Sequence, residues 1–104
     1  MPARVLALYN HPADTAAFDA HYTQTHIPTA KKIPGLRSYA VSSGPVGGGD
    51  GSPSPYHLVA ELGFDSAAAI QQALQTPEGA ATVADLGNFA QAGVTILIYE
   101  TKDV

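Results

Sequence analysis

The sequence predicts an α+β fold of the ferredoxin-like βαββαβ type, with four antiparallel strands and helices on one face of the sheet. Three observations predict it. Four short apolar runs recur along the 104 residues. Helix patterns with capping residues follow the first and third of these runs, and the resulting order is that of two β-α-β units sharing one sheet. A chain of this length has room for one domain with one core, here residues 1–104.

The first unit comprises a strand, a helix and a second strand. The run at 5–9 is apolar at both its odd and its even positions, which predicts a strand covered on both faces. Asp14 or Thr15 then caps a helix, and Pro28 breaks that helix or starts a new turn. The run at 36–43 predicts the second strand.

The second unit repeats this order. The third strand is expected at 56–64, and residues 65–66, Asp-Ser, cap a short helix after it. Thr-Pro-Glu at 76–78 starts another helix, with proline at its first position, and Gly93 ends it. The fourth strand is expected at 94–99, again apolar on both parities. The apolar residues that recur along the longer helix at three- and four-residue spacings are Val83, Leu86, Phe89 and Ala90.

A glycine- and proline-rich loop joins the second and third strands. Residues 44–55 read GPVGGGDGSPSP, with five glycines and three prolines in twelve positions. This composition is typical of a mobile connection. A slack hairpin loop is the first interpretation, and a lid over a pocket is the second, because long loops within compact domains are often functional.

Composition excludes several classes of function. Lys and Arg total five and the net charge is −4, so no basic stripe is available for nucleic acid or for an anionic membrane surface. No apolar stretch approaches the ~20 residues of a membrane span. The absence of cysteine removes disulfides, thiol catalysis and thiolate metal sites. We therefore expect a cytoplasmic protein.

Low charge predicts a homodimer. Charged residues make up 13% of the chain, against about 25% in average globular proteins, and 45% of residues are hydrophobic. The first and last strands are apolar on both faces, yet no element remains to cover the face without helices. A second copy is the simplest cover, and it would also protect an apolar edge strand.

His26 is the strongest candidate for chemistry. Phe18, Tyr22 and His26 follow one another at four-residue intervals, so they lie along one helix face. A neutral imidazole between helix and sheet can act as general acid or base near neutral pH. The alternative is a buried histidine bonded to a backbone carbonyl at the helix end.

For the other histidines a structural role is the first interpretation. His11 lies in a turn, His21 points to the surface, and His57 shares a strand face with Val59. His21 and His26 are five positions apart, on different sides of an α-helix, and no metal-binding pattern appears. Glycine motifs for phosphate binding are absent too, so we expect neither a metal nor a nucleotide cofactor.

A second polar cluster lies near the end of the longer helix. Asp85, Asn88 and Phe89 can share one face, where Asp85 could orient an imidazole or bind a polar substrate group. The alternative is a solvated aspartate. Tyrosines, including Tyr9, combine an apolar body with a polar tip that suits a pocket or an interface, although core packing also explains them.

Two segments carry a family resemblance. The pattern F-x3-Y-x3-H-x-P at 18–28, followed by I-P-G-L at 33–36, resembles the EthD (ethyl tert-butyl ether degradation) family of the dimeric α/β-barrel superfamily. T-P-E-G at 76–79, with D-L at 85–86 and N-F at 88–89, is similar to the second helical region of the same family. The resemblance spans nearly the whole chain except the glycine-rich loop.

The resemblance implies a ferredoxin-like protomer, a dimer whose sheets form a barrel, and a pocket between sheet and helices. Tyr22 and His26 match the pocket-lining motif of the family. Superfamily relatives include cofactor-free monooxygenases, polyketide cyclases, lactone isomerases, dehalogenases and haem enzymes. No residue here matches a proximal haem ligand pattern, and fold alone does not choose among the activities.

Our preferred hypothesis is an enzyme, or an accessory to a degradation pathway, acting on a small apolar or aromatic catabolic intermediate. It would be a cofactor-free oxidoreductase, an isomerase or a cyclase-type enzyme. A non-catalytic hydrophobic carrier and a purely structural dimer are the alternatives. In the enzyme, His26 is the acid/base group, and the residues expected to bind the substrate are Tyr9, Phe18, Tyr22, Asp85, Asn88 and Phe89.

Overall fold

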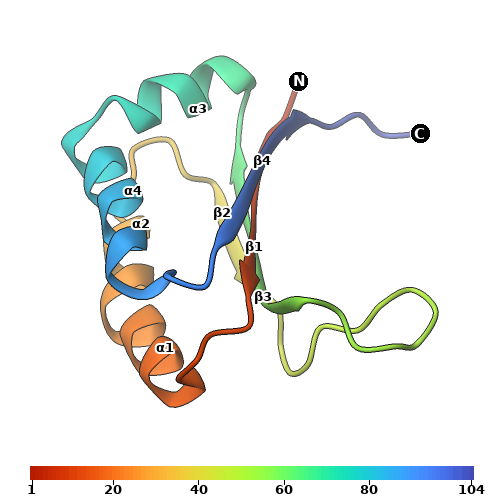
Figure 1. Cartoon of the computed structure of the whole chain (residues 1–104). Helices are drawn as coiled ribbons and strands as arrows, with labels where there is room; N and C mark the ends of the chain where they lie inside the picture. The colour runs from red at the N-terminus through yellow and green to blue at the C-terminus, as the bar shows by residue number, and fades with distance from the viewer.

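A four-stranded antiparallel sheet carries all the helices on one of its faces (Figure 1). The computed structural model describes residues 1–104. The strand order is β2-β3-β1-β4, which confirms the predicted ferredoxin-like fold. The elements in chain order are β1 (Ala3–Asn10), α1 (Thr15–His21), the π-helical turn η1 (Tyr22–His26), α2 (Ile27–Ala30), β2 (Ser38–Val41), β3 (Tyr56–Phe64), α3 (Ala67–Leu74), α4 (Pro77–Phe89) and β4 (Val94–Glu100).

The central strand β1 separates the two faces of the sheet. Its residues Ala7 and Tyr9 point toward the helices and are 4% and 2% exposed. The alternate residue Leu6 pairs with Glu61 on β3 and with Leu97 on β4, so these three side chains share the face without helices. The second strand, β2, is shorter than the eight residues expected.

Pro28 lies in the first turn of α2, which agrees with the expectation that it starts a new turn. Asp14 is the N-cap, accepting a hydrogen bond from the backbone N–H of Ala17 at 3.0 Å. Within η1 the helix widens, and the backbone N–H of Ile27 donates to the carbonyl of Tyr22, five residues back. A π turn of this kind widens the backbone hydrogen-bond pattern with which a proline in the helix interior would clash, so helical structure continues as α2.

The corner between α3 and α4 depends on a glycine. Ser66 and Thr76 cap the two helices, as expected. A Cβ atom at Gly79 would lie 2.0 Å from the carbonyl oxygen of Ala73, so no other residue fits at this approach of the two helices. The helix α4 ends at Phe89 rather than near Gly93, which instead adopts φ +111 before β4.

The face of the sheet without helices is bare and partly apolar. Leu97 and Tyr99 of β4 are 46% and 39% exposed. The loop 44–55 and the C-terminal tail extend on this side of the sheet, away from the helices (Figure 1). The loop therefore does not lie over the space between sheet and helices. No helix in the structure has the length and apolar character needed to cross a membrane.

Candidate functional site

An apolar cavity of about 240 Å³ lies between the sheet and the helices. Hydrophobic side chains provide 17 of its 19 lining residues. All four strands contribute to its floor, and η1, α2, α3 and α4 form its other walls. The lining residues with polar side-chain atoms are Tyr9, Tyr22, His26, Tyr39 and Thr82.

The cavity is open between α4 and β4, where the rim is apolar. Val83 is 53% exposed, and Ile96 and Ile98 are 42% and 43% exposed, although all three line the cavity. The periodicity of α4 groups Val83 with the buried Phe89, yet Val83 is exposed at the rim of the cavity. This opening is wide enough to expose apolar side chains on both of its sides.

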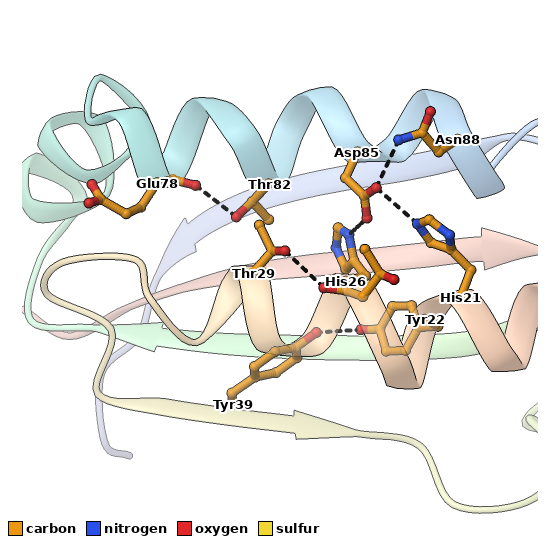
Figure 2. Close-up of polar contacts among 10 residues, drawn as sticks. His21, Tyr22, His26, Thr29, Tyr39, Glu78, Thr82, Asp85 and Asn88 are labelled. Atoms are coloured by element: carbon orange, nitrogen blue, oxygen red, sulfur yellow. Dashed lines mark hydrogen bonds and ion pairs between the residues drawn. The ribbon is translucent and has the colours of Figure 1, made fainter.

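His26 occupies the polar end of the cavity. Its side chain is 5% exposed, and Nδ1 lies 2.8 Å from Oδ2 of Asp85 (Figure 2). The carboxylate therefore favours the tautomer with hydrogen on Nδ1. Nε2 makes no hydrogen bond within the chain. Since every buried side-chain nitrogen and oxygen has a hydrogen-bond partner, Nε2 is not buried, and it is accessible to the cavity that His26 lines. Burial lowers the pKa of His26 and outweighs the raising effect of Asp85.

Asp85 is held by three donors. Besides His26, it accepts hydrogen bonds at Oδ1 from Nε2 of His21 at 2.9 Å and from Nδ2 of Asn88 at 2.9 Å. Desolvation raises the pKa of this carboxyl, but the hydrogen bonds from Asn88, His21 and His26 outweigh it and hold the pKa below its ordinary value. Asp85 is thus a buried carboxylate that orients the His26 ring.

A pair of tyrosine hydroxyls faces the same cavity. The hydroxyl oxygens of Tyr22 and Tyr39 are 2.7 Å apart. One of the two hydrogens bridges the pair, and Tyr22 is also hydrogen-bonded to the side chain of Tyr9, which lines the cavity too. Burial, with the neighbouring phenols, raises the pKa of Tyr22, and burial raises the pKa of Tyr39, so both remain phenols and hydrogen-bond donors.

The predicted substrate-binding residues divide into two groups. Tyr9, Tyr22 and His26 line the cavity, whereas Asp85 and Asn88 stand behind His26. The expectation that Phe18 and Phe89 wall the cavity is wrong. Both line a separate outer cleft, and their rings pack against those of Tyr9, Tyr22 and, for Phe89, His26.

Two residues of the site escaped sequence reasoning. His21 was expected at the surface on the side away from His26, but the π turn between them brings both imidazoles onto Asp85. A π turn has more residues per turn than an α-helix, so positions five apart come closer to one face. Tyr39 reaches the site from β2, and its alternation with Val41 gave no hint of a partner on η1.

The other histidines lie away from the cavity. His57 contributes an unpaired residue to β3, because β1 and β3 shift register there. Its ring meets Phe18 edge to face, and Nε2 lies 2.8 Å from Oδ1 of Asp19, so it does not simply share the face of Val59. His11 binds the carbonyl of Ser54 in the glycine-rich loop at 3.0 Å.

Comparison with known proteins places this chain among close relatives. It is 43% identical over 101 residues to an uncharacterized 11.0 kDa protein in the thcB-thcC intergenic region of Rhodococcus erythropolis, covering 97% of this chain and 96% of the relative. It is 38% identical to an ethyl tert-butyl ether degradation (EthD) family protein from Bacillus halodurans, whose crystal structure superposes with a TM-score of 0.88 over 98% of this chain and 100% of the other.

More distant structures share the fold. A dimeric ferredoxin-like protein from Thermobifida fusca is 18% identical with a TM-score of 0.70, covering 97% of this chain and 92% of that one. SnoaB, a cofactor-independent oxygenase from Streptomyces nogalater, is 14% identical with a TM-score of 0.65, covering 99% and 94%. Structural relatives are therefore dimeric ferredoxin-like proteins. The EthD domain model matches residues 10–93, most of the chain. This chain belongs to the EthD family.

Proposed function

We propose that this protein abstracts a proton from the carbon next to a carbonyl group in a small apolar molecule. His26 is the base, and the hydroxyl pair of Tyr22 and Tyr39 stabilises the resulting enolate. The observation that carries the proposal is the accessibility of His26 Nε2 to an apolar cavity while Nδ1 is bound to Asp85.

The base requires a neutral imidazole with a free nitrogen. Burial lowers the pKa of His26, which keeps the ring neutral near pH 7. When Nε2 takes the proton, the ring becomes an imidazolium whose charge the Asp85 carboxylate offsets at 2.8 Å. Asp85 therefore stabilises the His26 imidazolium formed by proton transfer more than the neutral imidazole that precedes it.

The tyrosine pair provides the complementary donor. An enolate places negative charge on the former carbonyl oxygen, and a fixed donor in a water-poor cavity stabilises that charge strongly. The hydroxyls of Tyr9, Tyr22 and Tyr39 use two hydrogens in the bonds between them, which leaves one O–H for the ligand. The rings of Tyr22 and His26 are neighbours, with centroids 5.2 Å apart, and both line the cavity, so one ligand can contact both.

The cavity defines the substrate class. An engineered cavity of about 150 Å³ binds benzene, so about 240 Å³ accommodates a larger ring system. The lining provides few polar atoms and no Lys or Arg, which favours a neutral ligand with one oxygen at the His26 end. An aromatic or alicyclic ketone meets these requirements.

The fate of the carbanion decides the product. Return of the proton at another carbon gives an isomer. Reaction of the carbanion with dioxygen as co-reactant gives an oxygenated product without a resident cofactor, and the fold shared with the cofactor-independent oxygenase SnoaB supports testing this route. Both outcomes begin with the same proton abstraction by His26.

Deuterium exchange tests the proposal directly. The α-hydrogens of 2-tetralone are followed by NMR in D₂O with wild-type protein, His26→Gln and His11→Gln. Wild type and His11→Gln are expected to exchange them faster than buffer, and His26→Gln is expected to lose at least about 10²-fold of that rate. Binding of the ketone without exchange above buffer would overturn the enzymatic proposal and favour a carrier of hydrophobic ligands.

We also propose that two copies pack through the bare faces of their sheets. The Thermobifida fusca protein of the same fold is described as dimeric, which supports a dimer here. Leu97 and Tyr99 would then be covered, and the loop 44–55 and the C-terminal tail, which extend on this side, would flank the partner (Figure 1). Sedimentation at micromolar concentration is expected to give twice the 10.7 kDa mass of the chain. A particle of 10.7 kDa would contradict the dimer.

A further inference from the structure

One carboxylate joins two imidazoles that face different spaces. His26 lines the inner cavity, and its side chain is 5% exposed. His21 lines an outer cleft of about 570 Å³, and its side chain is 28% exposed. Asp85 lies between them, with Oδ2 on His26 and Oδ1 on His21 (Figure 2). The three side chains connect the inner cavity with the outer cleft through the helix layer.

We propose that His21 exchanges the proton of the site with solvent. In the empty site the positive charge resides on His21, whose Nε2–H donates to Asp85. When His26 accepts a proton at Nε2 from a ligand, His21 releases its Nδ1 proton to water in the outer cleft. One proton enters the cluster and one leaves it, so the net charge of the cluster is unchanged. This inference rests on the proposed function, in which the bound ligand donates the proton to His26.

Electrostatics disfavours the presence of both charges at once. Asp85 carries one negative charge, which balances one imidazolium and not two. A charge on His21 lowers the pKa of His26, alongside the larger effect of burial. By the same coupling, a charge on His26 favours loss of the proton from His21, because linkage between two sites is reciprocal.

Few other charges act on this cluster. Asp14, at the N-cap of α1, lines the outer cleft with His21, and Asp85 is the acidic group contributed by α4. Asp19 on α1 is paired with His57. The groups facing His26 from η1, β1 and β2 are the phenols of Tyr22, Tyr9 and Tyr39, whose pKa values burial raises. No Lys or Arg lines either space.

Because the inner cavity is apolar, a proton leaves the site more readily through the outer cleft. A bound ligand fills the cavity and leaves little room for water to carry a proton away. His21 already borders the outer cleft, in company with Asn88 and Asp14. Proton release there leaves the ligand undisturbed.

NMR titration of the imidazoles in the ligand-free protein tests the inference. In wild type, His26 is expected to titrate below its ordinary pKa of 6.5, because burial and, to a smaller extent, a charge on His21 lower its pKa. In His21→Gln, whose side-chain amide can still donate to Asp85, His26 is expected to take over the charge. Its titration should move to higher pH, because the charge on His21 that lowers the pKa of His26 is gone.

The outcomes separate this inference from the proposed function. His11→Gln, outside the cluster, serves as control and should leave the titration of His26 unchanged. Unchanged titration of His26 in His21→Gln would overturn the inference, as would titration of His26 at or above its ordinary value of 6.5 in wild type. The wild-type measurement decides the matter even if the variant does not fold. Deuterium exchange on 2-tetralone reports separately on the proposed function, because the titration needs no ligand.

Discussion

Asp85 on α4 binds Nδ1 of His26 at 2.8 Å, although 59 positions separate the two residues in the chain. The contact joins the two β-α-β units across the helix layer. It orients the one imidazole that reaches the apolar cavity, and it supplies a counter-charge for that imidazole.

Asp85→Asn should impair proton abstraction. Asparagine retains the shape but not the charge, and it can present an N–H to Nδ1, which disfavours the tautomer that leaves Nε2 free. We expect the exchange rate of 2-tetralone to fall by about 10²-fold or more, with the ketone still bound. Equal rates for Asp85→Asn and wild type, with folding verified by circular dichroism, would remove Asp85 from the mechanism.

Stability should decline on acidification because of His26. Burial holds the pKa of folded His26 below its ordinary value of 6.5, so the unfolded chain binds this proton first. The contribution of His26 is therefore present above pH 6.5 and is lost as the pH falls toward the folded pKa. Urea unfolding at pH 7.5 and 5.5 should show a smaller loss in His26→Gln than in wild type. The other histidines are common to both proteins, so equal losses would contradict this assignment.

Substitution of the tyrosine pair should separate donor from partner. Removing the hydroxyl that donates to the ligand, in Tyr22→Phe or Tyr39→Phe, should lower the exchange rate by about 10²-fold. Replacing the tyrosine that does not contact the ligand removes only the hydrogen bond between the two hydroxyls. That substitution should lower the unfolding free energy by about 1 kcal/mol and reduce the exchange rate less. If both variants exchanged at the wild-type rate, the pair would have no part in stabilising the enolate.

Two glycines of α4 offer a matched test of packing. Gly79→Ala places Cβ 2.0 Å from the carbonyl of Ala73, so we expect a loss of about 2 kcal/mol of unfolding free energy. Gly87→Ala meets nothing within 4 Å and should gain about 0.5–1 kcal/mol from helix propensity. Urea denaturation of the two variants measures both. A Gly79→Ala protein as stable as wild type would show that the corner between α3 and α4 can open.

The bare sheet face should respond to charge differently from the cavity rim. Leu97→Glu places a carboxylate in the proposed dimer interface, so sedimentation at micromolar concentration should shift toward the mass of one chain. Val83→Glu adds the same charge at a position that is 53% exposed on the helix side and should leave the dimer intact. Dissociation by both variants, or by neither, would argue against the sheet face as the interface.

Much of the fold was predictable because its signals are local. The caps at Asp14, Ser66 and Thr76 and the bounds of β3 agree with the sequence prediction. A cap depends on a side chain and the backbone amides two or three residues later, and a strand on alternation along one short run. The order of these elements then leaves few topologies, of which the ferredoxin-like sheet is one.

The site depended on contacts that periodicity does not describe. The 3.6-residue period identified the buried Phe18, Tyr22 and His26, but the π turn that brings His21 to Asp85 departs from that period. Helical spacing also grouped Val83 with Phe89, but Val83 is exposed at the rim of the cavity, because exposure there depends on how the helices lie over the sheet.

By itself, then, the sequence determined the elements, their order, and the presence of an inward-facing histidine in aromatic company. Only the tertiary structure decided which groups meet that histidine, because Asp85, His21 and Tyr39 come from different elements. Distances of hydrogen-bond length between such groups are set by the packing of helices on the sheet, and no spacing along one segment encodes them.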